Sequence, residues 1–215
     1  MIKKNVPIAV IKRLPRYFRY LSDLLKNNTM AKISSQELSR SMGLTASQIR
    51  QDLNCFGGFG QQGYGYNVKS LYYEIGNILG VDKLFKAIVI GAGNLGVAIA
   101  NNVNFVKRGV KLIGIFDVAQ SKIGAECNNL AVLDMDKLEA FCKEHKPQIA
   151  ILTLPKTVAP EVFLRLKNCG IKGFWNFSNM ELPVTETDVI ENVHLGDSLM
   201  TLCYSIKEKE ETISN

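Results

Sequence analysis

The sequence predicts an α/β protein of two domains, a small helical domain over residues 1–85 and a doubly wound parallel sheet over residues 86–215. Two short helical patterns that meet at a glycine predict the first domain. An apolar strand, a glycine-rich turn and a helix in direct succession predict the second. Charge divides at the same place, because residues 1–85 hold 12 Lys and Arg against 5 Asp and Glu, whereas residues 86–215 hold 14 against 15.

Composition narrows the class of protein. The 215 residues are 47% hydrophobic and 21% charged, which excludes collagen-like and wholly disordered chains. No apolar run reaches the roughly 18 residues that a membrane span needs, and residues 1–11 lack the apolar core of a signal peptide. The five cysteines form no Cys-x-x-Cys pair. We therefore expect a soluble, reduced, cytoplasmic protein without a membrane partner.

Two longer helices are predicted near the two ends of the first domain. Pro15 suits the first turn of a helix that runs to about Lys26, because the N–H that proline lacks would have no helical partner there. Asn67 is a good N-cap, and the helix that it opens ends at Gly80, before the second domain. Both patterns place apolar residues on one face, so we expect each helix to bury that face in the core.

Two shorter helices lie between them. Ser34 and Glu37 have the spacing of a capping box, and the helix that follows ends at Gly43. Thr45 and Gln48 repeat the spacing and predict a second helix. Its inward residues are Ile49, Leu53 and Phe56. Two short helices joined at a glycine are typical of a helix-turn-helix.

A helix-turn-helix places the N-terminal residues of its second helix against base edges in the major groove of DNA. The glycine-rich stretch 57–66 follows that helix and predicts a β-hairpin wing along the phosphate backbone. The basic excess of residues 1–85 favours a polyanion partner, because neutralising phosphates releases counterions. A plain helical bundle with a solvated basic face is the alternative, and the wing favours DNA binding. The predicted DNA-binding residues are Arg13, Arg16, Ser47, Gln48, Arg50, Gln51, Gly60, Tyr64 and Tyr66.

The second domain carries the sequence G-x-G-x-x-G at Gly91, Gly93 and Gly96, and Asp117 lies 21 residues beyond the third glycine. The first glycine makes a turn, the second lets the backbone approach a pyrophosphate, and the third lets helix and strand pack closely. The phosphates would bind at the N-terminus of the helix. Asp117 would accept hydrogen bonds from the adenosine ribose and repel a 2′-phosphate, which favours NAD(H) over NADP(H). The whole unit predicts a Rossmann-like domain.

Strands and helices alternate through the rest of this domain. The predicted strands are 87–90, 111–116, 131–133, 148–154, 173–177 and 193–195, and the first helix is 97–105. The segment Thr153–Pro155 ends a strand at the edge where open α/β sheets bind ligands. An amphipathic helix predicted at about 197–207 covers its own sheet or docks on a partner subunit.

No catalytic set is recognisable in the sequence. Neither His145 nor His194 belongs to a Ser/His/Asp, metal-binding or Tyr-x-x-x-Lys pattern. We therefore expect no catalytic residue and no metal site, and a dinucleotide that acts as a signal rather than a reagent. Three alternatives stay open: a small NAD-dependent oxidoreductase with a basic oligomerisation domain, a repressor that senses another nucleotide such as coenzyme A, and a thiol-based sensor.

A winged helix-turn-helix followed by an NAD-type Rossmann domain resembles the redox-sensing repressor family Rex over nearly the whole chain. The segments that carry the resemblance are Lys12–Pro15, Ile49–Leu53, Phe56-Gly57, Gly63–Tyr66, Gly91–Gly96, Phe116-Asp117, Leu152–Pro155, Gly170–Gly173 and Asn176-Phe177. The resemblance implies a homodimer that binds a palindromic operator in double-stranded DNA and represses fermentation and respiration genes. It implies that NADH releases the repressor and that NAD+ permits binding, with both as sensed ligands. It also implies that the C-terminal helix is exchanged between subunits.

The motifs and the resemblance together define a predicted nucleotide site. Its residues are Gly91, Ala92, Gly93, Asn94, Leu95, Gly96, Asn102, Asp117, Val118, Thr153, Leu154, Pro155 and Phe177. Three positions depart from the family pattern. Asn102 stands where the family often has a tyrosine that takes part in sensing the nicotinamide. Gln51 stands where the family usually has a second basic residue, directly after the arginine of the recognition helix. His194, with Asp197 nearby, stands where an aspartate of the family pairs, in the DNA-bound state, with the arginine that matches Arg13.

Overall fold

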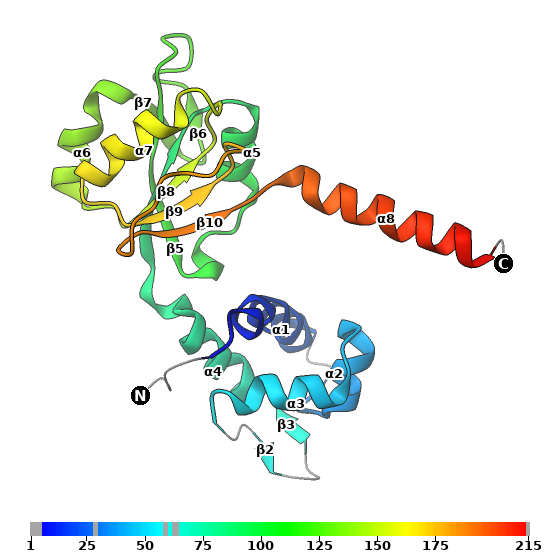
Figure 1. Cartoon of the computed structure of the whole chain (residues 1–215). Coiled ribbons are helices and arrows are strands. Elements are labelled where there is room, and N and C mark those ends of the chain that lie inside the picture. The colour runs from blue at the N-terminus through cyan, green and yellow to red at the C-terminus, as the bar shows by residue number, and fades with distance from the viewer. Residues whose placement is uncertain (1–5, 28–29, 58–59, 62–64, 214–215) are drawn as a thin grey trace. The chain divides into compact units, whose positions relative to one another are not determined.

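The computed structural model describes residues 6–27, 30–57, 60–61 and 65–213, and the chain divides into two compact units, Met1–Lys83 and Leu84–Asn215 (Figure 1). Unit 1 contains α1 (Ile8–Lys26), β1 (Lys32–Ile33), α2 (Ser35–Met42), α3 (Ala46–Asn54), β2 (Gly60–Gln61), β3 (Gly65–Asn67), α4 (Val68–Leu79) and a 3-10 turn (Val81–Lys83). Strand β3 lies between β1 and β2 and is antiparallel to both. The helices and this small sheet share one core, which includes Leu14, Tyr17, Ile33, Leu38, Ile49, Leu53, Leu71 and Ile75.

Helix ends in unit 1 follow local capping residues, as predicted. The side chains and backbones of Ser34 and Glu37 form both bonds of a capping box at the start of α2, and Gly43 ends it with φ of 62°. Asn67 caps α4, which ends at Gly80. Thr45 caps α3 but forms only half of the predicted box, because the side chain of Gln48 turns to another partner.

Helix α1 begins at Ile8 rather than at Pro15, so the prediction that Pro15 occupies its first turn is wrong. A proline inside a helix removes one backbone hydrogen bond and strains the preceding turn. Pro15 is exposed, whereas Val10 and Leu14 are buried before it and Tyr17 is buried after it. Burial of one helix face therefore outweighs the local preference of proline. Phe56, predicted on α3, lies beyond the end of that helix and is half-buried.

Unit 2 is a seven-stranded sheet with the order β10-β9-β8-β4-β5-β7-β6. Its elements are β4 (Phe85–Ile90), α5 (Asn94–Asn102), a 3-10 turn (Val106–Arg108), β5 (Val110–Asp117), β6 (Glu126–Cys127), β7 (Leu130–Asp134), a 3-10 turn (Met135–Lys137), α6 (Leu138–His145), β8 (Ile149–Leu152), α7 (Ala159–Asn168), β9 (Gly173–Asn176), β10 (Val189–Asn192) and α8 (Leu195–Ile213). Every neighbouring pair is parallel except β6 and β7. The chain leaves the central strand β4 toward β5 on one side and returns to β8 on the other. A ligand site is expected at this switch point, outside the carboxyl ends of β4 and β8.

Two apolar layers cover the sheet, and the residues of β4 alternate between them. Ile88 and Ile90 pack into one core with residues of α6 and α7. Ala87 and Val89 pack into the other with residues of α5. Figure 1 shows α6 and α7 on one side of the sheet and α5 on the other. The prediction of a doubly wound parallel sheet is confirmed.

Several predicted boundaries in unit 2 are wrong. The strand predicted at 193–195 is β10 at Val189–Asn192, and Leu195 opens α8, which runs to Ile213. An edge strand with one exposed face has no continuous apolar run, so its residues resemble a loop. Helix α5 begins at Asn94 and ends at Asn102, three residues earlier at each end than predicted. Among the described residues, no helix combines the length and the apolarity needed to cross a bilayer.

Candidate nucleotide site and DNA-binding face

The glycine-rich loop leaves β4 at Gly91, whose φ of +99° lies in the region that favours glycine. A Cβ atom at Gly91 would lie 2.7 Å from the carbonyl oxygen of Thr153, and one at Gly96 would meet the carbonyl oxygen of Gly91. A Cβ atom at Gly93 would have no neighbour within 4 Å. Two glycines therefore allow the loop, β8 and α5 to pack closely, and Gly93 leaves open the space that a pyrophosphate would take.

Helix α5 starts beside this space. Gly93 is its N-cap and has no side chain to bond the N–H groups of the first turn. Asn94 and Leu95 follow, and both are exposed. The first-turn N–H groups and the helix dipole together suit a phosphate.

Asp117 ends β5 and holds the glycine-rich loop in place. Its Oδ2 accepts the backbone N–H of Ala92 at 2.7 Å, and its Oδ1 accepts that of Ala119 at 2.8 Å. Lys122 Nζ lies 3.2 Å from Oδ2. Burial opposes ionisation of the carboxyl, but the bonds from Ala119, Lys122 and Ala92 outweigh it and lower the pKa of Asp117. The sequence predicted that Asp117 accepts hydrogen bonds from a ribose. It did not reveal that Asp117 bonds the backbone of the loop or that Lys122 is its partner.

Thr153 holds the same loop from the other side. Its hydroxyl lies 2.7 Å from the carbonyl oxygen of Gly91 and 3.0 Å from that of Ile90, so one O–H is shared between the first residue of the loop and the last residue of β4. Leu154 is half-buried and Pro155 is exposed beyond it. The glycine-rich loop is thus bound to the ends of both neighbouring strands.

Apolar side chains flank the polar loop. Val118, directly after Asp117, is 76% exposed, and Leu95 is 37% exposed. Phe177 follows β9 and packs edge-on against Trp175, with ring centroids 4.7 Å apart. These surfaces suit the flat faces of an adenine and a nicotinamide ring.

Asn102 is not brought to the loop. It is the last residue of α5, eight residues and about 12 Å along the helix axis from Asn94. Its side-chain amide donates to the carbonyl oxygen of Ala98 in its own helix. The structure therefore groups the predicted residues 91–96, 117–118 and 153–155 and leaves Asn102 apart.

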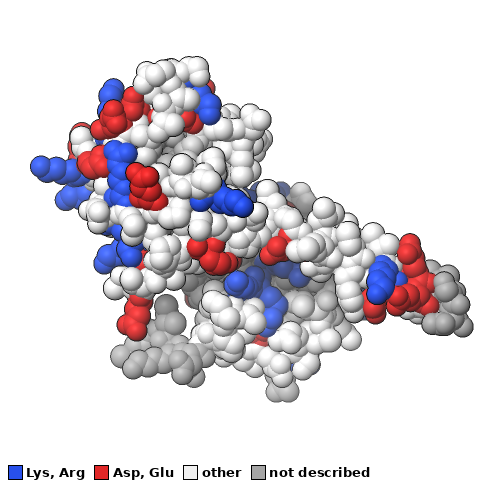
Figure 2. Space-filling model, turned by 45° about the horizontal axis from the view of Figure 1, so that its top comes forward, with Lys and Arg blue, Asp and Glu red and all other residues white. Residues whose placement is uncertain are grey.

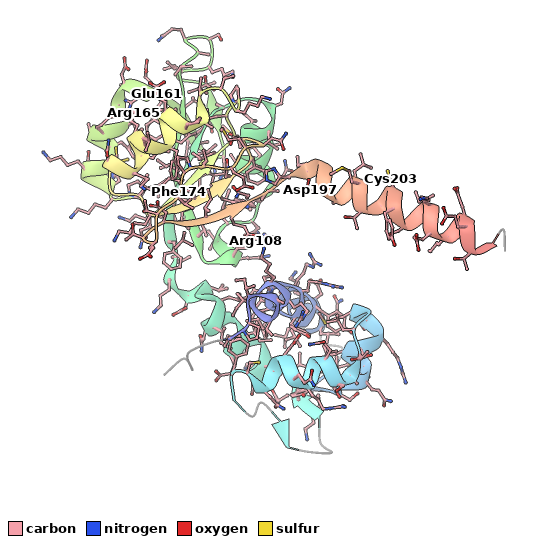
Figure 3. All side chains as sticks on the ribbon, in the orientation of Figure 1. Arg108, Glu161, Arg165, Phe174, Asp197 and Cys203 are labelled. Atoms are coloured by element: carbon pink, nitrogen blue, oxygen red, sulfur yellow. The ribbon has the colours of Figure 1, made fainter. Side chains whose placement is uncertain are left out.

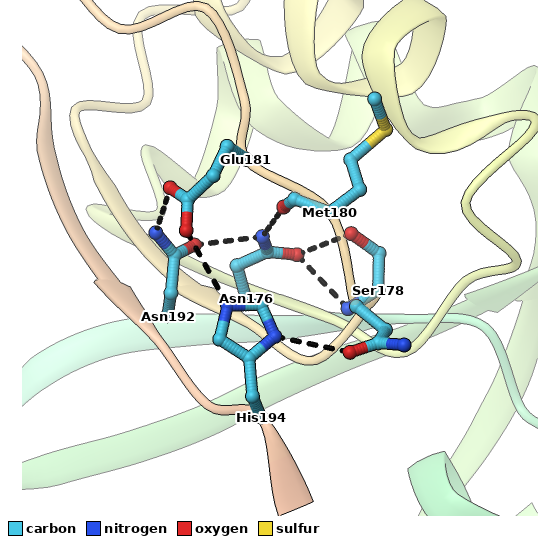
Figure 4. Close-up of polar contacts among 7 residues, drawn as sticks. Asn176, Ser178, Met180, Glu181, Asn192 and His194 are labelled. Atoms are coloured by element: carbon cyan, nitrogen blue, oxygen red, sulfur yellow. Dashed lines mark hydrogen bonds and ion pairs between the residues drawn. The ribbon is translucent and has the colours of Figure 1, made fainter. Parts of the chain in front are cut away.

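A polar cluster lies at the ends of β9 and β10, the two strands that follow β8 on its side of the sheet (Figure 4). The buried amide of Asn176 donates at 2.8 Å to Asn192 Oδ1 and to the carbonyl oxygen of Met180, and accepts from Ser178. Asn192 in turn donates to Glu181 at 2.7 Å. His194, which precedes α8, places Nδ1 3.1 Å from Asn179 Oδ1 and Nε2 3.4 Å from Glu181 Oε1. The cluster fixes the segment from which α8 begins.

The apolar side chains of α8 are not buried against any other described part of the chain. Every described side chain from Leu195 to Thr212 is exposed. The exposed apolar residues are Leu195, Leu199, Met200, Leu202, Tyr204 and Ile206. In Figure 2 the body of α8 is white and its charged side chains gather at the C-terminal end.

The predicted DNA-reading helix is α3. Ser47, Arg50 and Gln51 are exposed on it, as predicted, and Arg50 Nη1 donates to Ser35 Oγ at 3.0 Å. Gln48 is only half-exposed, and its Nε2 donates to Asp52 Oδ1 at 3.0 Å. Three of the four predicted side chains are thus exposed, and one of these, Arg50, bonds the Ser35 hydroxyl of α2. The fourth, Gln48, is half-buried and bonds a buried carboxylate.

Arg13 and Arg16 hold unit 1 together in this structure. Arg13 donates through Nε and Nη2 to the two oxygens of Asp52, each at 2.7 Å. Arg16 Nη2 donates at 2.8 Å to the carbonyl oxygen of Met42, the last residue of α2. Sequence reasoning missed Asp52, although an acid beside the inward-facing Leu53 was the available signal.

The wing is described in part. Gly60 lies opposite Tyr66 in the antiparallel pair of β2 and β3. Burial raises the pKa of the Tyr66 phenol. Tyr64 lies outside the described residues.

All five cysteines are free thiols. Burial raises the pKa of Cys127 and of Cys169, and it raises that of Cys142 to about 12. Cys203 is exposed on α8 (Figure 3). Because the thiolate is the reactive form, the three shifted thiols are poorly suited to redox sensing. Among the described residues, no group of three or more His, Cys, Asp and Glu could hold a metal ion.

Two family models match the two units. The model described as "Putative DNA-binding protein N-terminus" matches residues 5–54, and the model described as "CoA binding domain" matches residues 82–180. The redox-sensing transcriptional repressor Rex of Caldicellulosiruptor saccharolyticus is 52% identical over 96% of this chain and 94% of its own length. The chain belongs to the Rex family. Rex of Clostridioides difficile is 53% identical over 95% of this chain and 97% of its own.

Solved Rex-family structures match nearly the full length of this chain. RSP, in complex with NAD+ and operator DNA, is 51% identical and superposes with a TM-score of 0.88 over 99% of this chain and 97% of its own. RSP in complex with NADH is 48% identical, with a TM-score of 0.89 over 99% of both chains. The predicted fold class, an N-terminal DNA-binding domain followed by a Rossmann-like sheet, is confirmed.

Proposed function

We propose that this Rex-family chain is a transcriptional repressor that binds a palindromic operator in double-stranded DNA and senses the ratio of NADH to NAD+. The observation that carries the proposal is the pairing of two sites on one chain: the exposed face of α3 and the loop between Gly91 and Gly96. RSP, solved with NAD+ and operator DNA and also with NADH, matches the chain over both sites. The nucleotide is a regulatory ligand in this proposal, and the protein is a regulator, not an enzyme.

The DNA site combines base edges and phosphates. Ser47, Arg50 and Gln51 carry exposed hydrogen-bonding groups, and arginine and glutamine side chains can pair bidentately with guanine and adenine. Gly60 and Tyr66 pair in the wing, and with Tyr64, predicted from the sequence, they are the residues to which we assign contacts with the sugar–phosphate backbone. Arg13 and Arg16 support these contacts from within unit 1 through Asp52 and Met42.

The nucleotide site would bind NADH and NAD+ with the diphosphate at Gly93 and the adenosine between Asp117 and Val118. Its proposed members are the predicted residues 91–96, 117–118, 153–155 and Phe177. Asn102 was predicted for the same site, but it lies at the other end of α5 and bonds within its own helix. The two redox forms differ at the nicotinamide, since the oxidised ring is positively charged and the reduced ring is not. An apolar surface around that ring would penalise the cation and favour NADH.

We propose that the functional protein is a homodimer joined through α8. A two-fold axis would give two copies of α3 and would explain a palindromic operator. The exposed apolar face of α8 is the surface that a second subunit would cover, by exchange of this helix. NADH would shift the dimer toward a state in which the two copies of α3 do not match the operator spacing. The size of this shift is limited by the difference in NADH affinity between the two states of the dimer. We place the protein in the cytoplasm, with its DNA and the NAD pool.

Coenzyme A is a second candidate ligand, because the family model over residues 82–180 is described as a CoA binding domain. The two ligands share an adenosine and a diphosphate, but coenzyme A has a ribose 3′-phosphate. A carboxylate such as Asp117 beside the ribose repels that phosphate. We therefore favour NADH and NAD+.

Fluorescence anisotropy of a labelled palindromic operator tests the proposal. At fixed salt, protein-bound operator is titrated with NADH, with NAD+ and with coenzyme A. Release by NADH alone is the expected result. Release by coenzyme A alone would change the ligand, release by neither would remove the sensing function, and no operator binding would favour the oxidoreductase alternative.

A further inference from the structure

Asp52 is a buried carboxylate on α3 that joins this helix to α1. Its side chain is 1% exposed. Arg13 donates two hydrogen bonds to it at 2.7 Å, and the hydroxyl of Tyr17 donates at 2.9 Å. Both donors lie on one face of α1, four residues apart. Gln48, one turn earlier on α3, supplies the remaining donor at 3.0 Å.

These donors keep the carboxyl ionised. Burial opposes ionisation, but the bonds from Arg13, Gln48 and Tyr17 outweigh it and lower the pKa of Asp52. A buried carboxylate is stable only while its oxygens are bonded, so every donor that leaves it weakens the junction between α1 and α3.

The side chain of Gln48 is therefore held by a partner within the unit, and this bond competes with contact to a base. A glutamine that recognises adenine presents its amide oxygen and its amide N–H to the same base. The amide nitrogen of Gln48 donates to Asp52, and its backbone N–H is bonded at 3.1 Å to Thr45 Oγ1. One N–H of this amide is held by Asp52 and the side chain is half-buried, so swinging the side chain outward to reach a base edge would remove a donor from a buried carboxylate. Gln51, three residues further along α3, is exposed.

We propose that Gln48 is a positioning residue of the DNA-binding helix rather than a base-reading one. Through Asp52 it sets the N-terminal turn of α3 against Arg13 and Tyr17 of α1. Base selection then belongs to the exposed Ser47, Arg50 and Gln51. This inference rests on the proposed DNA-binding function and assigns roles within that site.

The test compares base preference, not affinity alone. The full-length protein is titrated against its operator and against a panel of duplexes, each with one base pair of both half-sites changed. Gln48→Met keeps the side-chain length and removes the amide, and Gln48→Lys keeps a donor for Asp52 but has no acceptor. Gln51→Met is the matched control, because it makes the same change at an exposed position of the same helix.

We expect Gln48→Met to weaken binding to every duplex by a similar factor and to leave the order of preference unchanged. Gln48→Lys should also keep that order. Gln51→Met should relax the preference at one base pair, where each mismatch otherwise costs roughly 5- to 150-fold in affinity. Circular dichroism and the unfolding temperature report the folding of each variant, and Gln48→Lys decides the question should Gln48→Met not fold.

A preference lost at the same single base pair in every Gln48 variant that folds would overturn the inference, because it would make Gln48 a reader of that base. Wild-type protein that binds every duplex equally, or none, would overturn the proposed sequence-specific DNA binding and this inference with it. The two failures are distinguished by the wild-type panel alone.

Discussion

The backbone N–H of Ala92 donates to Oδ2 of Asp117 at 2.7 Å, although 25 residues separate the two in the chain. The bond joins the glycine-rich loop after β4 to the end of β5. An acid at this place is expected to bind a ribose, and here it also holds the loop that faces the diphosphate. Asp117 therefore holds the loop in the structure, and in the proposed function it would also bind the ribose.

Asp117→Ala should weaken NADH binding by about 10- to 150-fold, because hydrogen bonds to a charged group are worth roughly 1.5–3 kcal/mol. The dissociation constant is measured by NADH fluorescence or calorimetry. Asp134→Ala is the control, since Asp134 lies opposite Asp117 in the next strand and caps a local turn. Equal NADH affinity in wild type and Asp117→Ala would contradict the role given to this carboxylate.

Gly96→Ala and Gly93→Ala should fail in different ways. A Cβ atom at Gly96 meets the carbonyl oxygen of Gly91, so the variant should lose thermal stability as well as NADH binding. A Cβ atom at Gly93 has open space and an ordinary φ of −74°, so the variant should keep the wild-type unfolding temperature. It should still bind NADH more weakly, because the methyl group lies where the diphosphate would pass. Unfolding temperature and NADH affinity, measured for both, decide this.

The pair of Arg13 and Asp52 should make stability depend on pH. The pKa of Asp52 is lowered in the folded chain from an unfolded value of about 3.9, so its contribution to stability is present above about pH 4 and is lost as pH falls through the folded pKa. Asp52→Asn should cost roughly 3 kcal/mol of unfolding free energy at pH 7 and progressively less below pH 4. Urea denaturation at several pH values measures the difference. The exposed Asp23→Asn is the control, and a loss that does not change with pH would refute the ionic account.

Charged substitutions on α8 should separate the proposed dimer. Leu199 and Leu202 are 61% and 54% exposed, and burying two aspartates in their place would be unfavourable. Leu199→Asp combined with Leu202→Asp should sediment as the 23.9 kDa monomer. Lys209→Asp, at the charged end of the helix, should leave the assembly unchanged. A double variant that remains a dimer would place the interface elsewhere.

Local chemistry accounts for what the sequence predicted well. The starts of α2 and α4 depend on Ser34, Glu37 and Asn67, whose bonds reach no further than three residues. The glycine-rich loop is similar, because strand, turn and helix are contiguous. Each of these features is decided by neighbours in the chain.

The remaining features depend on residues far apart in sequence. Helix α1 continues on both sides of Pro15 because Leu14 and Tyr17 are buried in the core, and this burial cannot be read from the local sequence. Arg13 reaches Asp52 across 39 residues, so no local pattern could reveal that it has a partner inside the unit. The boundary between β10 and α8 falls in a segment whose polar side chains bond to Glu181 and Asn179, which precede the strand.

The glycine-rich loop is fastened from both sides, by Asp117 at the end of β5 and by Thr153 at the end of β8. A loop built before its ligand arrives loses little conformational entropy on binding. The oxidised and reduced cofactors are chemically identical in the half that such a loop would hold, so it would strengthen both affinities equally. In a sensor of this kind, the glycine-rich loop would set the total cofactor concentration at which the sites fill. The part of the site that meets the nicotinamide end of the cofactor would set how that occupancy divides between the oxidised and the reduced form.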